Sequence, residues 1–310
     1  MIPAASLRNQ QGLGAIFAVG AYLIWGVLPL YFLILTPTGA WEVVAWRVLL
    51  SLAFCAVVIA VTRGWRRLWT IIQDPRLLAL TALAGILIYV NWQAFLIGTL
   101  TGHVVETALG YFINPITTVL LGVFVLHERM RRLQWVAVGM AGIAVVVIIV
   151  AYGTVPWIAL TLTVSFGVYG LVKKRIGPSV DAVSGLTLES FWLVPIAVVQ
   201  LVAVGATTGI TFGNNGAWHT ILLCFAGVAT AVPLLLFAAG TRRVALTIVG
   251  MIQFITPIMQ FLIGVLVLHE PMPPERWIGF ILVWVAVVLF VVDLLLAARR
   301  ARRNVTPHPA

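Results

Sequence analysis

Three charged side chains, Arg47, Glu106 and Glu189, lie inside long apolar stretches of the sequence. If these stretches cross a membrane, each charge costs ~2.5–3.5 kcal/mol on insertion scales and is expected to face a partner charge or a water-filled cavity. Arg47 and Glu106 fall in the outer third of their stretches, and Glu189 in the inner third. We therefore expect Arg47 and Glu106 to form an ion pair or to share one cavity wall.

The chemistry open to these side chains is the recognition of charge and the carriage of protons. A poorly solvated carboxyl group can hold a proton, so Glu106 is the candidate for proton coupling. Arg47 would balance that charge or bind a carboxylate of the substrate. The alternative is structural, because a buried ion pair could simply lock two helices together.

A polar stripe follows one of the stretches and recurs 142 residues later. At ~100° per residue, the polar and small residues of 104–126 fill one arc of about 140°, and apolar residues fill the rest. The equivalent positions in the second copy are polar as well. Tyr111, Asn114 and Thr118 become Gln253, Thr256 and Gln260. This pattern favours a cavity wall built by both halves, with helix packing through hydrogen-bonding residues as the alternative.

Two prolines and a mid-span amide add weaker indications. Pro115 and Pro257 would each leave a carbonyl group without its helical hydrogen bond and allow a helix kink beside the stripe. Asn91 lies near the middle of the stretch 77–98 and is a further candidate for the cavity.

Two His-Glu pairs, at 127–128 and 269–270, consist of metal-ligating residue types, but their spacing is wrong for a metal site. A zinc-protease pattern needs a second histidine four residues after the first, where this chain has Arg131 and Pro273. These pairs are expected to cap helices or to contribute to gates. We expect no metal and no other cofactor, and without a glycine-rich phosphate loop we expect no ATP-driven transport.

The composition shows which elements must position these residues. Of 310 residues, 62% are apolar and 9% are charged, whereas soluble domains are about 25% charged. This argues against a soluble enzyme, a nucleic-acid-binding domain and a disordered chain. A spanning helix takes ~20 residues, and ten such stretches can be delimited. They cover residues 13–35, 41–61, 77–98, 104–126, 133–150, 155–171, 183–204, 218–240, 245–268 and 276–297.

The basic residues predict the orientation. With both termini inside, seventeen of the nineteen Lys and Arg residues lie in cytoplasmic segments, and only Arg276 lies outside, with Arg47 in a span. The net charge of +10 therefore reflects topology, together with contact of the basic face with anionic lipid, and not a nucleic-acid partner.

An internal repeat with an offset of 142 residues organises the chain. The segment 112–116 matches 254–258, and both copies continue to Leu-His-Glu and a tryptophan, Trp135 or Trp277. A unit of five helices would enter the membrane from opposite sides in its two copies. Inverted repeats suit alternating access around a site near the membrane midplane.

The whole chain resembles the EamA-type drug/metabolite transporter superfamily. The resemblance rests on the two proline-containing segments that end in Leu-His-Glu. The motifs at 20–26, 42–47, 91–93 and 110–115 resemble its RarD branch, usually described as chloramphenicol-sensitivity permeases. The resemblance implies a ten-helix inner-membrane permease with a central cavity and no established substrate.

The sequence thus predicts an all-α integral membrane protein of ten transmembrane helices in two inverted five-helix repeats, 1–150 and 151–298, with a basic cytoplasmic tail, 299–310. It is expected in the bacterial plasma membrane and is not expected to be an enzyme. The predicted function is a secondary-active permease for a small polar or amphipathic metabolite, an exporter in one reading, with protons as a candidate coupling ion. A passive facilitator and a non-transporting sensor or assembly subunit are the alternatives.

Overall fold

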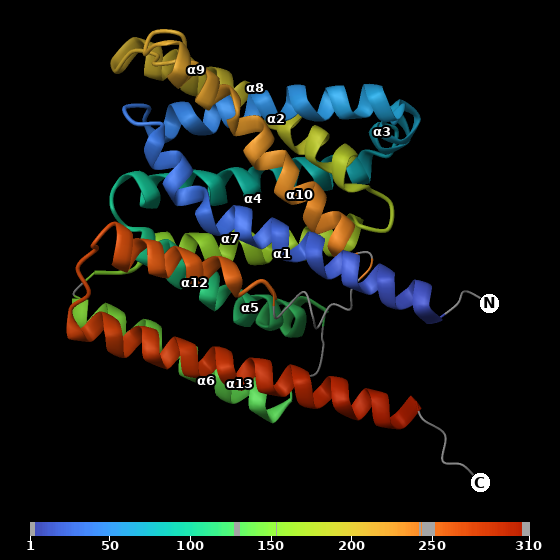
Figure 1. Ribbon diagram of the computed structural model, residues 1–310, viewed down its shortest axis with the longest axis vertical. Helices are drawn as coiled ribbons and strands as arrows, with labels where there is room; N and C mark the ends of the chain where they lie inside the picture. The colour runs from blue at the N-terminus through green and yellow to red at the C-terminus, as the bar shows by residue number, and fades with distance from the viewer. Residues whose placement is uncertain (1–3, 127–130, 153, 242, 244–251, 306–310) are drawn as a thin grey trace.

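The computed structural model describes residues 4–126, 131–152, 154–241, 243 and 252–305, and these residues are helical apart from turns and short connections (Figure 1). More than twenty side chains within the described helices, that of Thr118 among them, are also outside the description. The helices are α1 (Ala4–Ile34), α2 (Ala40–Thr62), α3 (Trp65–Ile72), α4 (Pro75–Leu100), α5 (Val104–Leu126), α6 (Arg132–Tyr152), α7 (Trp157–Ile176), α8 (Ala182–Thr207), α9 (Ala217–Cys224), α10 (Ala226–Thr241), α12 (Ile255–Leu262), the π-helix η1 (Ile263–Val267) and α13 (Pro274–Val305).

Seven of the described helical segments are long and apolar enough to cross a membrane, and two shorter apolar helices cover 157–173 and 255–267. Each of the ten predicted stretches contains helix, but two are not single uninterrupted helices. The stretch 218–240 is divided at Phe225 into α9 and α10, and the stretch 245–268 has only α12 and η1 among its described residues.

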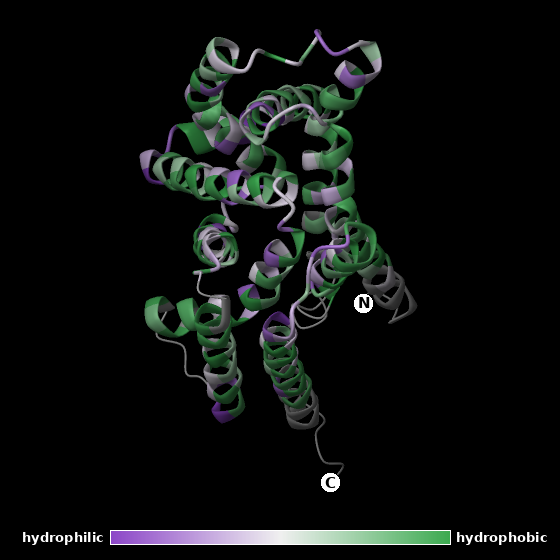
Figure 2. Cartoon of the chain, turned by 90° about the vertical axis from the view of Figure 1, so that its left-hand side faces the viewer, coloured by the Kyte–Doolittle hydropathy of each residue, from purple (hydrophilic) through white to green (hydrophobic). Residues whose placement is uncertain are grey.

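The long helices run roughly alongside one another across Figure 1, and the turns and loops that connect them gather at two opposite ends of the bundle. We call the end at which α1 begins and α13 finishes the basic end, because α3 and its arginines lie there. The opposite end carries the α1–α2 turn, the α4–α5 turn and the α8–α9 loop. Figure 2 shows the predominantly apolar character of the helices between these ends.

Helices from the first half of the chain pack against helices from the second half in corresponding pairs. In the first pairing, α1 packs against α10 and α12, while α7 packs against α4 and α5. In the second, α4 packs against α8, while α10 packs against α2. The helices α2 and α8 pack against each other, as do α6 and α13, which lie side by side at the edge of the bundle (Figure 1). The main core is the apolar cluster formed by buried side chains of α1, α2, α4, α7 and α8, together with Leu223 of α9 and Ala229 and Ala231 of α10.

Glycines allow some of these helices to approach closely. A Cβ atom on Gly85 would lie 2.9 Å from the carbonyl oxygen of Glu189, and one on Gly110 would lie 2.9 Å from that of Ala159. Both contacts are with backbone atoms, which cannot rotate away. The crossings of α4 with α8 and of α5 with α7 therefore depend on these glycines, as is common for helices in membranes.

Candidate functional site

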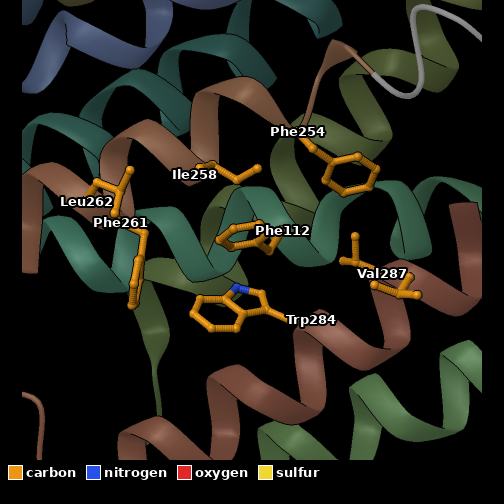
Figure 3. A pocket seen from close by; sticks show the side chains of 8 residues that line it. Phe112, Phe254, Ile258, Phe261, Leu262, Trp284 and Val287 are labelled. Carbon is orange, nitrogen blue, oxygen red and sulfur yellow. The ribbon is translucent and has the colours of Figure 1, made fainter.

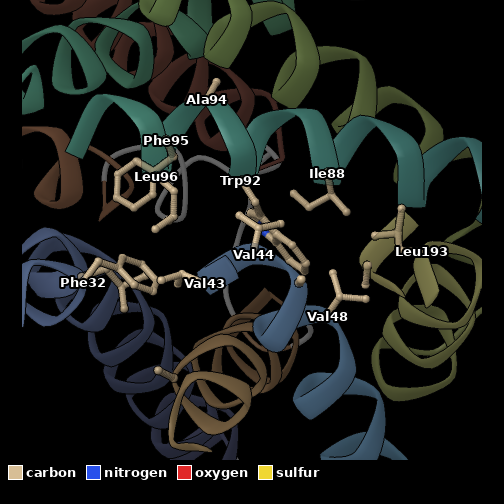
Figure 4. Close-up of a cluster of buried hydrophobic side chains, with 14 of the residues drawn as sticks. Phe32, Val43, Val44, Val48, Ile88, Trp92, Ala94, Phe95, Leu96 and Leu193 are labelled. Carbon is tan, nitrogen blue, oxygen red and sulfur yellow. The ribbon is translucent and has the colours of Figure 1, made fainter. Parts of the chain in front are cut away.

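Arg47 on α2 is a buried cation without a carboxylate partner among the described residues. Its side chain is 4% exposed, and its guanidinium lies 4.2 Å from the ring centre of Trp92 and 5.5 Å from that of Phe32. Figure 4 shows both rings in the main apolar core. Nε donates to the hydroxyl of Thr230 at 2.6 Å, while Nη1 has no hydrogen-bond partner. Aromatic faces stabilise this cation only partly, so Nη1 is a buried donor group whose hydrogen-bonding capacity is not used within the described residues.

Glu189 on α8, at the position equivalent to Arg47, is by contrast neutralised. Its side chain is 1% exposed. Lys173 Nζ lies 2.7 Å from Oε1, and the Tyr169 hydroxyl donates to Oε2 at 3.1 Å. The Lys173 side chain is 29% exposed. This pair therefore connects a buried carboxylate to a partly exposed cation near the basic end.

Glu106 on α5 does not contact Arg47, so the predicted ion pair between them is wrong. The Glu106 carboxylate accepts the backbone N–H groups of Ile158 at 2.9 Å and of Ala159 at 3.4 Å. These groups belong to the first turn of α7, where N–H groups have no partner within the helix and attract a negative charge. A shared wall and a role in proton coupling remain predictions.

The polar stripe of α5 faces α4 and α7. The Tyr111 hydroxyl donates to Asn91 Oδ1 at 3.3 Å. The amide of Asn91 donates to the Leu162 carbonyl at 3.1 Å and to the Ser165 hydroxyl at 3.2 Å. Asn114 is 7% exposed, and the side chain of Thr118 lies outside the described residues. Most of these groups already bond to neighbouring helices, which supports a packing role for the stripe.

The second copy of the stripe makes equivalent contacts with α1. The Thr256 hydroxyl donates to the Tyr22 carbonyl at 2.7 Å, and Gln260 Nε2 donates to the Trp25 carbonyl at 3.2 Å. Gln260 is 1% exposed, and its Oε1 has no partner. Gln253 is partly buried beside the start of α12.

Pro115 and Pro257 occupy different positions within their helices. α5 continues through Pro115 as one helix, whereas Pro257 is the third residue of α12. In the first turn of a helix the missing N–H removes no helical hydrogen bond. Helix kinks at Pro115 and Pro257 remain a prediction.

The second Leu-His-Glu segment caps a helix, as expected for these pairs. Glu270 is 7% exposed and accepts the backbone N–H groups of Val104 at 2.5 Å and Val105 at 3.0 Å, at the start of α5. Burial raises the pKa of Glu270, although these hydrogen bonds oppose the change. The first copy, 127–128, lies outside the described residues.

Glu42 is a buried carboxylate that the sequence analysis missed. It is 1% exposed and accepts the backbone N–H groups of Thr211 at 2.9 Å and Phe212 at 3.1 Å, as well as the indole N–H of Trp46 at 3.2 Å. Its place in the first turn of α2 resembles an ordinary exposed helix start, so the sequence carries little signal for this role. Glu42, Glu106 and Glu270 together tie the opposite end of the bundle through backbone N–H groups.

An apolar cavity of about 310 Å³ lies between α5, α12 and α13 (Figure 3). Its eight lining residues are all aromatic or aliphatic, and Figure 3 shows Phe112, Phe261 and Trp284 turned toward one another. Such a lining offers few groups to orient a polar ligand. Buried donors without a hydrogen-bond partner are found elsewhere, and Arg47 Nη1 on α2 and Gln93 Nε2 on α4 are two of them.

Comparison with known proteins agrees with this arrangement of two helical halves. The model of the EamA-like transporter family matches residues 12–150 and again residues 155–292. The chain belongs to the EamA-like transporter family. This EamA-family chain is also 43% identical to "Protein RarD" of Streptomyces exfoliatus over 295 residues, which are 95% of this chain and 93% of the relative. It is 38% identical to "Protein RarD" of Escherichia coli, covering 95% of this chain and 99% of the relative. These matches place it in the RarD branch.

Two further matches are more distant in sequence. A "Chloramphenicol-sensitive protein RarD" of Pseudomonas aeruginosa is 29% identical over 95% of this chain and 99% of its own length. One solved crystal structure superposes with a TM-score of 0.58 at 15% identity, covering 91% of this chain and 98% of that one. That structure shares the fold alone. The chain is accordingly a multi-pass helical membrane protein of a transporter family.

Proposed function

We propose that this EamA-family chain is a secondary-active permease that moves a small polar or amphipathic metabolite across the bacterial plasma membrane by alternating access. The observation that carries the proposal is Arg47, a cation buried among aromatic rings with Nη1 unbonded. Leaving an ion unpaired in an apolar interior costs several kcal/mol. A transporter offsets this cost when the charge binds its substrate, whereas a protein that only packed its helices would be more stable without it.

The architecture proposed for this mechanism is ten transmembrane helices in two inverted five-helix repeats, 1–150 and 151–298, followed by the basic tail 299–310. The exchange of helix pairs supports it, since α1 with α10 and α12 mirrors α7 with α4 and α5. Two copies related in this way can close opposite ends of one path in turn. The clustering of arginines at the basic end supports cytoplasmic termini and contact with anionic lipid.

For proton coupling, the contacts favour Glu189 over Glu106. Glu106 is occupied by the first turn of α7. Glu189 bonds a lysine whose side chain is partly exposed, so a proton could replace the lysine as its partner. Protonation of Glu189 would leave Lys173 without its counter-ion and would alter the charge of the path.

The test uses purified protein in proteoliposomes loaded with the dye pyranine. Chloramphenicol, amino acids and sugars are first screened by thermal shift, and a stabilising compound is then used for counterflow and proton-flux measurements. We expect Arg47→Gln to abolish counterflow. The matched control is Arg76→Gln, which removes an exposed arginine at the basic end and should leave counterflow unchanged.

Equal counterflow by the two variants would assign Arg47 to structure. Counterflow without proton movement would indicate a passive facilitator, and no counterflow of any stabilising compound would favour a non-transporting sensor.

A further inference from the structure

Six aromatic rings form a continuous file through the main core. Each ring centre lies 5.1–6.3 Å from the next. The rings come from α1, α4, α5 and α7, and therefore from both halves of the chain. In order, they are Tyr31, Phe32, Phe95, Tyr111, Phe166 and Tyr169.

A cation lies against each end region of this file. The guanidinium of Arg47 is 5.5 Å from the ring centre of Phe32, and Nζ of Lys173 is 5.7 Å from that of Tyr169. Contacts of this length are within the range of cation–π attraction. The file therefore links the cation nearer the opposite end of the bundle to the cation nearer the basic end.

The two cations differ in their counter-charges. Nη1 of Arg47 has no partner, and no described carboxylate forms a salt bridge with it. Lys173 already bonds Glu189 at 2.7 Å. An incoming anion would meet no competitor at Arg47, but would compete with Glu189 for Lys173. The first site is thus the stronger one for an anion, and the second allows its release.

The repeat places these groups in corresponding positions. With the offset of 142, Tyr31 corresponds to Lys173 and Arg47 to Glu189. Each half thus has the same two positions, one on its first helix (Tyr31 on α1, Lys173 on α7) and one on its second helix (Arg47 on α2, Glu189 on α8). The cation occupies the second-helix position in the first half and the first-helix position in the second half. Each half therefore supplies one cation, and the two pairs of positions lie at the two ends of the file.

The six aromatic residues differ in how deeply they are buried. Tyr31, Tyr111 and Phe166 are only partly buried, whereas Phe32, Phe95 and Tyr169 are buried. Packing therefore does not fully enclose three of the six side chains in the file. Aromatic faces and edges favour a planar apolar body, and a guanidinium favours a carboxylate.

Resting on the proposed function, we infer that the substrate is a small organic anion with an aromatic body, an aromatic carboxylate, which binds first at Arg47 and passes along the aromatic file to Lys173. The rings stack with its body while the two cations hold its carboxylate in turn. Glu189 displaces the carboxylate from Lys173 and restores the neutral pair.

The ligand part of the test needs no variant. Binding of phenylacetate, phenylacetamide and acetate to the wild-type protein in nanodiscs is measured by isothermal titration calorimetry. Phenylacetate carries both the ring and the charge, and each of the other two lacks one of them. We expect phenylacetate to bind at least tenfold more tightly than either. Equal affinity for phenylacetamide, or no binding of phenylacetate, overturns the inference.

Variants then separate the two cations. Arg47→Gln should weaken phenylacetate binding at least tenfold, and Arg47→Lys should retain part of it. The double variant Lys173→Gln/Glu189→Gln removes the second cation without leaving a buried carboxylate unpaired. It should bind phenylacetate normally but fail in counterflow. Unchanged binding by both Arg47 variants, or normal counterflow by the double variant, contradicts the two-site path.

The outcomes for this inference and for the proposed function are distinguishable. Counterflow of a neutral compound by a protein that does not bind phenylacetate supports the permease and overturns the substrate class. Tight binding of phenylacetate without counterflow of it or of any other compound supports the anion site and overturns the permease.

Discussion

Removal of the Glu106 carboxylate tests directly whether this residue caps α7 or couples transport to protons. In Glu106→Ala, the N–H groups of Ile158 and Ala159 lose their acceptor. Both residues are at most 2% exposed, so water cannot readily replace the carboxylate. Glu106→Gln keeps one side-chain oxygen in place and removes only the charge.

The magnitude follows from these two contacts. Leaving a buried donor unsatisfied costs ~1–3 kcal/mol. The Ile158 contact at 2.9 Å has normal hydrogen-bond length, whereas the Ala159 contact at 3.4 Å is weak. We therefore count about one full bond and a fraction of another. The loss of the charge at a helix N-terminus adds ~0.3–1 kcal/mol. Glu106→Ala should lower the free energy of unfolding by about 2–4 kcal/mol, and Glu106→Gln by about 1 kcal/mol.

The assay is equilibrium unfolding in mixed micelles with increasing sodium dodecyl sulfate, followed by tryptophan fluorescence, alongside counterflow in pyranine-loaded proteoliposomes. In the capping interpretation, Glu106→Gln transports and moves protons like the wild type. The reasoning is refuted if Glu106→Ala unfolds like the wild type. It is also refuted if Glu106→Gln is stable but has lost proton movement, because the charge would then act in coupling.

Three further predictions concern the other contacts that hold the helices together. Glu42→Ala removes the acceptor of two backbone N–H groups in the α8–α9 loop and should lower the free energy of unfolding by about 1–3 kcal/mol, because Thr211 and Phe212 are only partly buried and water can replace part of the lost bonding; faster proteolysis of the loop near Thr211 would confirm it, and wild-type stability would contradict it. Because the pKa of Glu270 is raised above its ordinary value of 4.5, the folded protein retains this proton to higher pH than the unfolded chain, so stability should fall as the pH rises from 4.5 to the raised value. Thermal melting at several pH values should show a smaller fall for Glu270→Gln, and identical profiles would count against the effect. Gly85→Ala should lower the melting temperature and reduce counterflow, because its Cβ would lie 2.9 Å from the backbone oxygen of Glu189; normal melting would show that the crossing can adjust.

Much of the fold could be predicted because apolar runs of spanning length have few alternatives in a membrane. Helix was found in each of the ten stretches, and the repeat of the stripe appeared as equivalent contacts of α5 with α7 and α12 with α1. The interruption at Phe225 was not predictable in this way, since the apolar run continues through it without a change of composition. Hydropathy reports how apolar a segment is, and it does not report local changes in backbone conformation.

Some residues of the candidate site could be predicted from the sequence, but Glu42 and the partners of the buried charges could not. Arg47 and Glu189 stand out because charges are rare in apolar runs, and their types and positions can be read directly from the sequence. Which acceptor or donor each one meets depends on helix crossings that bring together residues far apart in the chain. Arg47 meets Thr230 at a separation of 183 residues. The sequence alone placed the Glu106 carboxylate inside an apolar run, and it could not show that this carboxylate accepts the N–H groups of α7 instead of pairing with Arg47.

The sequence by itself determined the helical membrane class, the family, the repeat and the short set of buried charges, because each of these depends on composition or on spacing along the chain. The tertiary structure alone decided which charges are satisfied. It joined Lys173 to Glu189 and Glu106 to the start of α7, and it left Arg47 among aromatic rings with Nη1 free. The reason is physical: the energy of a buried charge depends on the few ångströms around it, and helix packing sets those distances.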